Sequence, residues 1–224
     1  MIVTAANDSI CVDVPESART LAGFRAWAAS DSFPDHGRIT YFREGIFLDM
    51  SPEKANKHNS VKTEISRALG NLVKERDLGK LHGDGLWITN DHAKLSNEAD
   101  ATFVSWDSLE SGRIQLIKSP DDDDGIEMRG SADWVLEVVS NSSERKDTVW
   151  LPKAYHAAGV REYWLVDARG QQIEFTIHAW HPNGFEAIQP DNDGWRNSEV
   201  FECAVRLDRV RDRMAGWSYE LLIR

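Results

Sequence analysis

The chain has 224 residues, 41% hydrophobic and 28% charged, with a formal net charge of −11 at pH 7, which suits one globular domain with a sizeable core. It lacks an apolar run of about eighteen residues, a secretory signal pattern and any metal-type spacing of its two cysteines, Cys11 and Cys203, so we expect a cytoplasmic protein without membrane contact, disulfide framework or structural zinc. The acidic charge argues against a strong, general DNA binder, because such proteins usually carry a basic surface.

The first elements predicted are a short helix and a hairpin. Leu21, Phe24 and Trp27 recur at a spacing of three, which predicts a brief N-terminal helix. Two alternating apolar runs within residues 37–51 flank Arg43-Glu44-Gly45 and predict two antiparallel strands.

A long helix follows the hairpin. Ser51-Pro52-Glu53 is a helix-start signal, and Val61, Ile65 and Leu69 then keep a helical spacing until the chain reaches Gly79. This segment carries the clearest helical pattern of the sequence.

The remaining segments alternate between predicted strands and one further helix. We expect that helix over 147–158, with an irregular first turn or a later start because of Pro152 and an end at Gly159. The predicted strands are 85–89, 101–106, 134–140, 161–168 and 172–180, with short strands after them.

These elements predict a mixed α+β fold, in which helices pack on a mixed β-sheet. We expect one domain overall, made of an N-terminal extension with a short helix (1–36), a core (37–182) and a β-rich C-terminal extension packed on the core (183–224). No internal repeat or low-complexity linker divides the chain.

Glu137 is the most informative residue, because it is an acid at the centre of the apolar strand 134–140, where an unpaired carboxylate is costly. A divalent cation such as Mg²⁺ is the simplest partner, since it binds through one or two carboxylates together with water and phosphate. Asp100, at the head of the strand 101–106, supplies a second acid. The alternatives are a buried ion pair for Glu137 and a turn-capping role for Asp100.

The segments ADWVLEVVSNSSERKD (132–147) and AYHAAGVREYWLVDARG (154–170) resemble the signature of the bacterial Uma-two family of restriction-endonuclease-like proteins, within the PD-(D/E)XK nuclease superfamily. The preceding pattern is also similar, with a hairpin that ends in DMSP (49–52), then His58, an amphipathic helix and an Asp-headed strand. The resemblance covers residues 38–180. It implies a restriction-endonuclease-like central mixed sheet flanked by helices.

By this resemblance Asp100 and Glu137 match the two metal-binding acids of the family. The chain departs from the family pattern at three positions. Ala99 stands where a proline usually precedes the first acid, Val139 replaces the lysine of the (D/E)XK element, and Leu151 occupies the position of a compensating lysine in the next helix.

Two other lysines are the nearest substitutes for the catalytic cation, namely Lys146, which we prefer, and Lys153. Because most lysine side chains in proteins are exposed to solvent, we expect the same of both. Arg145 adjoins Lys146, so a local positive surface stays open despite the acidic run 121–124.

The resemblance implies Mg²⁺-dependent hydrolysis of DNA phosphodiester bonds, with Mn²⁺ as a substitute. Asp100, Glu137 and the backbone carbonyl of Val138 would hold the ion, which lowers the pKa of a bound water. Glu64 would complete the metal shell, and His58 would contact the substrate. Alternatively, Glu64 lies on a solvated face and His58 is a hydrogen-bonded core residue.

Three classes of function therefore stay open. The first is a metal-dependent endonuclease that acts on DNA, and a homodimer would suit cleavage of both strands. The second is a catalytically silent module that binds nucleic acid or protein, which the missing lysines and the acidic charge favour. The third is a carbohydrate-binding β protein, which the nine tryptophans alone suggest.

Overall fold

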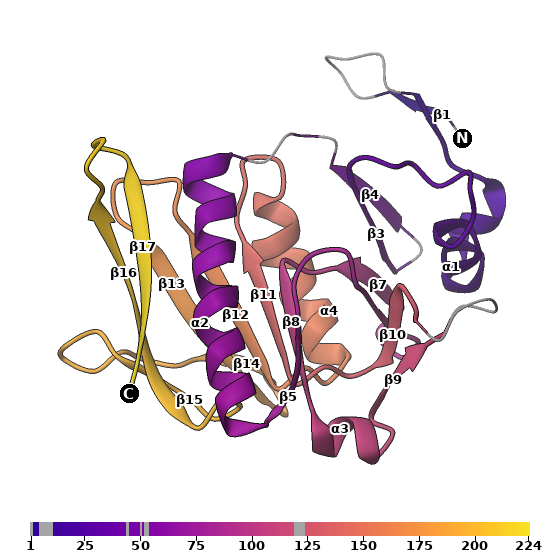
Figure 1. Ribbon diagram of the computed structural model, residues 1–224. Helices are drawn as coiled ribbons and strands as arrows, with labels where there is room; N and C mark the ends of the chain where they lie inside the picture. The colour runs from indigo at the N-terminus through magenta and orange to yellow at the C-terminus, as the bar shows by residue number, and fades with distance from the viewer. Residues whose placement is uncertain (1, 5–10, 44, 50, 52–53, 119–123) are drawn as a thin grey trace.

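The computed structural model describes residues 2–4, 11–43, 45–49, 51, 54–118 and 124–224. Within these residues the protein is a mixed α+β structure whose strands form two six-stranded sheets, a three-stranded sheet and a two-stranded sheet (Figure 1). The predicted mixed α+β class is confirmed, but the sequence did not predict that the strands divide into two large sheets. No helix in the described part of the chain is long and apolar enough to span a bilayer.

The N-terminal part contains the predicted helix and hairpin. Thr20 caps the helix by accepting a hydrogen bond from the backbone amide of Gly23 at 3.1 Å. Glu44, in the predicted turn of the hairpin, lies outside the described residues. The elements are β1 (Ile2–Thr4), β2 (Cys11–Asp13), a 3₁₀ turn (Glu16–Arg19), α1 (Leu21–Ala28), β3 (Arg38–Phe42) and β4 (Gly45–Asp49).

The long helix is present as α2 (Ser60–Arg76), which follows a single π-helical turn (Ala55–Asn59). Its apolar stripe is buried, since Val61, Ile65 and Leu69 have no exposed surface. Pro52 and Glu53 of the predicted start signal lie outside the described residues.

Residues 79–130 contribute strands to both large sheets. The elements are β5 (Gly79–His82), β6 (Trp87–Asn90), β7 (Leu95–Glu98), β8 (Ala101–Ser105), α3 (Trp106–Glu110), β9 (Ile114–Ile117) and β10 (Glu127–Gly130). One large sheet has the order β4-β3-β7-β6-β10-β9. The strands β5, β7, β9 and β10 were not predicted, because their short sequences lack a clear apolar alternation.

The other large sheet has the order β14-β13-β12-β11-β8-β5, with β11 parallel to β12 and antiparallel to β8. Pro152 lies in the first turn of α4, as the irregular start of the predicted helix required. The remaining elements are β11 (Trp134–Val138), a π-helical turn (Lys146–Trp150), α4 (Leu151–Ala157), β12 (Glu162–Asp167), β13 (Glu174–His181) and β14 (Gly184–Ala187).

Strand β11 is buried on both faces. Trp134, Leu136 and Val138 pack in the same apolar cluster as the stripe of α2. Val135 points the other way and packs in a second cluster with Tyr155 of α4 and with residues of the other large sheet. This double burial explains why the sequence of β11 reads as a nearly continuous apolar run.

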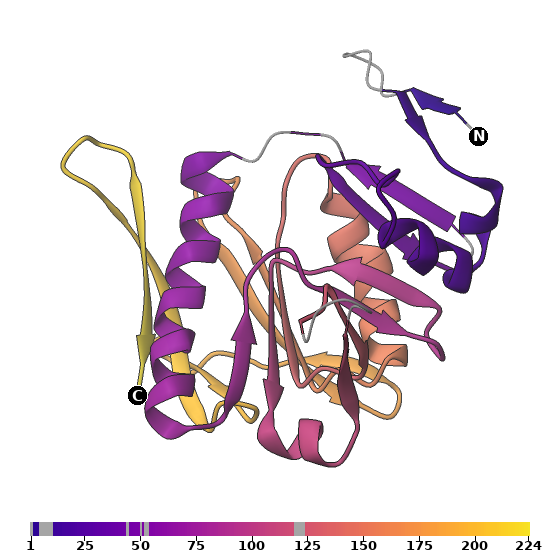
Figure 2. The ribbon, with the colours of Figure 1, turned by 45° about the vertical axis from the view of Figure 1, so that its right-hand side comes forward.

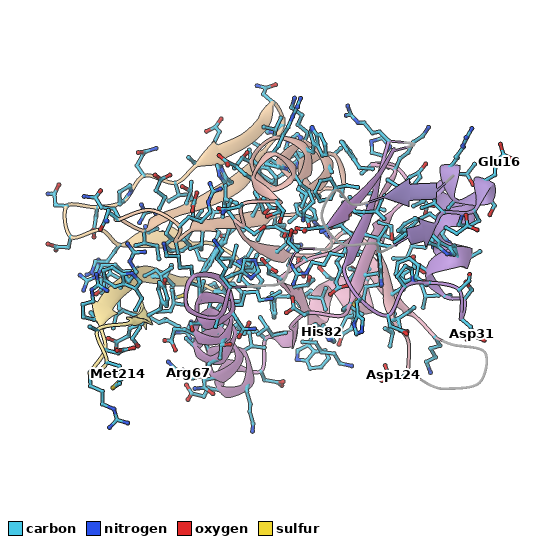
Figure 3. All side chains as sticks on the ribbon, turned by 90° about the horizontal axis from the view of Figure 1, so that it is seen from above. Glu16, Asp31, Arg67, His82, Asp124 and Met214 are labelled. Atoms are coloured by element: carbon cyan, nitrogen blue, oxygen red, sulfur yellow. The ribbon has the colours of Figure 1, made fainter. Side chains whose placement is uncertain are left out.

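The C-terminal strands β15 (Arg196–Ser198), β16 (Cys203–Arg211) and β17 (Trp217–Ile223) form a three-stranded sheet beside α2 (Figures 1 and 2). Phe201 has no exposed surface, and its ring centroid lies 5.1 Å from that of Phe103 and 5.5 Å from that of Trp134. Seen from above, Met214 in the β16–β17 hairpin and Glu16 near α1 lie toward opposite ends of the molecule (Figure 3).

Replacement of Phe201 by alanine tests whether the C-terminal extension belongs to one cooperative domain. We expect Phe201→Ala to lower the free energy of unfolding by about 3–5 kcal/mol, because it leaves a cavity between two core elements. Chemical denaturation should show one transition. Val210→Ala is the control, since the Val210 side chain is 51% exposed and should change stability little. Two separate transitions would contradict a single domain.

Candidate active site

The two acids singled out in the sequence meet where β8 begins and β11 ends. The backbone amide of Asp100 donates to the carbonyl of Leu136 at 3.0 Å, and the Oδ2 atom of Asp100 accepts from the amide of Val138 at 2.6 Å. The antiparallel pairing of β8 with β11 thus places Asp100 beside Glu137. Both carboxylates are almost fully buried, with 2% and 1% of the residue exposed.

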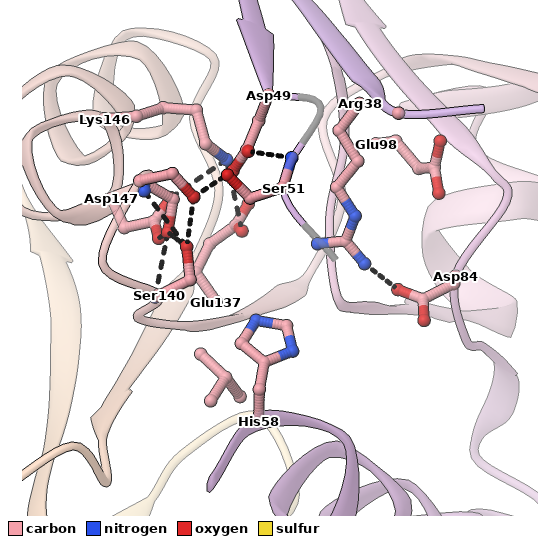
Figure 4. A pocket seen from close by; sticks show the side chains of 14 residues that line it. Arg38, Asp49, Ser51, His58, Asp84, Glu98, Glu137, Ser140, Lys146 and Asp147 are labelled. Carbon is pink, nitrogen blue, oxygen red and sulfur yellow. Dashed lines mark hydrogen bonds and ion pairs between the residues drawn. The ribbon is translucent and has the colours of Figure 1, made fainter. Parts of the chain in front are cut away.

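A pocket with a volume of about 370 Å³ opens over these strand ends. Glu137 and Val138 lie on its wall, while side chains from five other elements reach it (Figure 4). Arg38 comes from β3, His58 from the turn before α2 and Lys146 from the turn before α4, and two further acids, Asp49 of β4 and Glu98 of β7, complete these five elements.

Asp100 is surrounded by positive groups. Its Oδ1 atom accepts from Arg38 at 2.5 Å and lies 3.6 Å from Nζ of Lys62, and its Oδ2 atom lies 3.6 Å from Nε2 of His58. Arg38 and Lys62 also bind Asp84, at 2.8 and 2.6 Å. Burial raises the pKa of Asp100, but Arg38, His58 and Lys62 outweigh burial and leave this pKa below its usual value. Asp100 is therefore an anion at neutral pH.

Glu137 has the opposite electrostatic balance. Its Oε1 atom accepts from the hydroxyl of Tyr155 at 2.6 Å and from Nδ2 of Asn97 at 3.0 Å, and its Oε2 atom lies 3.7 Å from Nζ of Lys146. Burial raises the pKa of Glu137 to about 8, because Lys146 and the Tyr155 hydroxyl only partly offset the burial and the nearby charge of Asp147.

Lys146 is 3% exposed, and its Nζ atom lies 2.9 Å from Oδ1 of Asp147. Burial lowers the pKa of Lys146, but Glu137 and Asp147 outweigh this effect and raise it, so Lys146 stays charged. The Oδ2 atom of Asp147 accepts from the hydroxyl of Ser143. Lys146 is thus buried between the carboxylates of Glu137 and Asp147. The expectation from base rates that Lys146 is exposed was wrong.

The structure brings together only some of the predicted residues. Glu137, Val138, His58 and Lys146 line the pocket, and Asp100 lies behind its wall, in contact with His58 and with the Val138 amide.

Lys153 is exposed and lies away from the pocket wall, so the geometry does not support it as a substitute lysine. Glu64 is also elsewhere, because its carboxylate accepts from Arg67 at 2.8 Å and from the amide of Leu221 in β17 at 3.0 Å. The expected role of Glu64 in the metal shell is therefore wrong for this arrangement. Glu64 instead ties α2 to the C-terminal sheet.

Sequence analysis missed four residues that contact the acids, and it also missed Asp147, which pairs with Lys146. Lys62 had a usable signal, since it lies four residues after His58 and hence on the same face of the helix. The others come from distant segments and had no such signal, because only the packing of the two large sheets brings them to the acids. They are Arg38, Asn97 and Tyr155.

The acid pair also allows a test of metal fit. Among the described residues, no group of three or more His, Cys, Asp or Glu side chains is arranged to hold a metal ion. Mg²⁺ needs fewer protein ligands, because it keeps water and takes phosphate oxygens. Asp100 and Glu137 are hard oxygen donors, and Asp100 already attracts the cations Arg38 and Lys62. The pair fits a divalent ion bound through two carboxylates, provided that the ion replaces Arg38 at Oδ1 of Asp100.

Fold and site together define a protein of the restriction-endonuclease-like class. The sequence model of the Uma2 family, described as "Putative restriction endonuclease", matches residues 21–208, and the chain belongs to this family. The crystal structure of a "putative nuclease belonging to DUF820" from Anabaena variabilis has the same fold, with a TM-score of 0.59 and 18% identity over 82% of this chain and 90% of the other. No curated protein sequence matches.

The raised pKa of Glu137 predicts a pH-dependent stability. Between the ordinary value of 4.5 and about 8, the folded protein holds a proton on Glu137 that the unfolded chain has lost. The free energy of unfolding should therefore fall as pH rises through this window, by up to about 1.4 kcal/mol per pH unit. In Glu137→Gln this part of the slope should disappear, as urea denaturation at several pH values can measure.

The control for this pH series is Glu75→Gln, because Glu75 is exposed on α2. It should retain the wild-type slope. An identical slope in the wild type and Glu137→Gln would show that Glu137 is ionised in the folded protein across the whole window.

Proposed function

We propose that this protein is a metal-dependent nuclease that hydrolyses phosphodiester bonds of DNA at the pocket over β8 and β11. One observation carries the proposal, namely that Asp100 and Glu137 meet at adjacent strand ends with the charged Lys146 3.7 Å from Glu137. Membership of the Uma2 family supports a nuclease-like function. Asp100, Glu137 and the carbonyl of Val138 are the proposed ligands of Mg²⁺ or Mn²⁺.

When bound, the metal ion supplies a Lewis acid and lowers the pKa of a water molecule. The protein's own residues do the remaining work. Lys146 orients the attacking water and offsets the charge of the phosphate. It takes the place of the lysines of the family pattern, at whose positions this chain has Val139 and Leu151. Tyr155 and Asn97 fix the carboxylate of Glu137 through their hydrogen bonds. Arg38 lies on the pocket wall, where it can move from Asp100 to a substrate phosphate.

A catalytically silent binding module is the second candidate function. The observation that favours it is the contact of both Asp100 oxygens with protein donors, Arg38 on one side and the Val138 amide on the other. If Arg38 keeps this contact, the pocket binds phosphate through its cations without a metal ion. Metal titration separates the two functions.

Replacement of each acid tests the nuclease function. We expect wild-type protein to bind Mg²⁺ and Mn²⁺ in a calorimetric titration and to nick a supercoiled plasmid. Asp100→Asn and Glu137→Gln should each lose nicking by at least about a hundredfold and weaken metal binding, because each removes a charged ligand. Glu75→Gln, exposed on α2, is the matched control and should behave as wild type.

Nicking that persists in Glu137→Gln would remove Glu137 from the mechanism. Wild-type protein that binds DNA but no metal ion would establish the silent binding module instead. Near-ultraviolet circular dichroism should show that both variants keep the native packing.

The two candidate lysines give a second, independent prediction. Lys146→Met should lower kcat by roughly a hundredfold or more, because it removes the buried cation beside Glu137. Lys153→Met should leave kcat unchanged, because Lys153 is exposed and outside the pocket. Single-turnover nicking kinetics measure both. Equal effects of the two substitutions would contradict the assignment of Lys146.

A further inference from the structure

An apolar groove adjoins the pocket of the acid pair. Its volume is about 270 Å³, and its lining includes Phe42, Ile46, Phe47, Trp150 and Leu151 together with Lys146. Lys146 lines both cavities, so the groove and the pocket lie on either side of this buried side chain. None of the functions considered for the acids uses this groove.

Two pairs of residues show how pocket and groove run side by side. In β4, Asp49 and Phe47 are two residues apart and so share a face, with Asp49 at the pocket and Phe47 at the groove. In the turn before α4, Lys146 faces both cavities, and Trp150, four residues later, faces the groove. Both β4 and the turn before α4 thus place a polar residue at the pocket and an aromatic residue at the groove.

The aromatic walls of the groove are partly open to solvent. The ring centroids of Phe47 and Trp150 are 5.9 Å apart, and the rings are nearly perpendicular at 81°. Phe47 and Trp150 are both partly exposed. The guanidinium of Arg145 lies 5.6 Å from the centre of the Trp150 ring. A flat, apolar partner that carries negative charge nearby fits this surface.

We propose that the groove binds an unpaired nucleobase whose neighbouring phosphate lies in the pocket, near Arg38 and Lys146, so that the substrate is single-stranded or has a base out of the stack. This inference rests on the proposed function. Aromatic side chains contact the faces of bases, and these faces are hidden inside a duplex. Lys146 lines both cavities, so a nucleotide with its phosphate in the pocket would have its base at the groove.

The lining of the groove predicts weak selectivity among the four bases. Besides Lys146 and the indole N–H of Trp150, Thr40 is the polar side chain in the lining, and its hydroxyl already donates to Oδ1 of Asn97. Recognition of a base edge needs free donors and acceptors, whereas stacking needs only a π-face. The groove therefore accepts any base.

Oligonucleotide binding without metal tests the groove separately from catalysis. The probes are a labelled single-stranded oligothymidylate and a matched abasic strand, followed by fluorescence anisotropy in the presence of EDTA. Trp150→Ala and Phe47→Ala should each raise the Kd for oligothymidylate roughly tenfold, because each removes an aromatic contact with the base. The Kd for the abasic strand should not change.

Two variants serve as controls. Trp150→Phe keeps an aromatic ring and should bind oligothymidylate within about threefold of wild type. Trp180→Ala removes a 41% exposed tryptophan of β13 outside both cavities and should bind as wild type. Thermal melts should show that the Phe47 and Trp150 variants are folded.

The outcomes separate the groove from the nuclease. If oligothymidylate binding ignores Trp150 and Phe47, or if the abasic strand loses as much affinity, the base site is wrong whether or not the protein nicks plasmid. If binding depends on both residues but no strand is cut, the base site holds and the nuclease function fails. Wild-type protein that binds neither strand overturns the base site. A dimer in sedimentation analysis that Trp150→Ala separates into monomers also overturns it, because the groove would then be covered by a second copy of the chain.

Discussion

The structure depends on the compensation of two buried carboxylates. An uncompensated buried acid is costly, so the charges of Asp100 and Glu137 constrain every element around them. Asp100 meets this constraint with the cations Arg38 and Lys62, and Glu137 meets it with Tyr155 and a proton. The partners come from β3, α2 and α4, so both large sheets must pack correctly before either acid is stable.

The same compensation concentrates positive charge at one place in a chain that is acidic overall. The net charge of −11 belongs to the whole sequence. At the pocket, however, Arg38, Lys62 and Lys146 are concentrated around the acids and are themselves buried or partly buried. Low exposure weakens screening by salt and water, so these few cations act strongly at short range.

The departures from the family pattern have a common structural meaning. Leu151, which the sequence resemblance matches to a lysine of the family pattern, is fully buried in the wall of the apolar groove. Lys146, five residues earlier, reaches the acid pair instead and borders the same groove. With Leu151 at this position, an aromatic and aliphatic surface lies beside the acid pair. Its effect is a pocket that combines a charged half with an apolar half.

The sequence by itself determined the main helices, the hairpin, the strands 101–106 and 134–140 and the acid pair, because each follows from local periodicity or from an acid in an apolar strand. It also favoured Lys146 over Lys153. Only the tertiary structure decided that Glu64 ties α2 to β17 and that Arg38, Asn97 and Tyr155 reach the acids. These contacts join residues distant in the chain, and local patterns contain no information about which distant segments pack together.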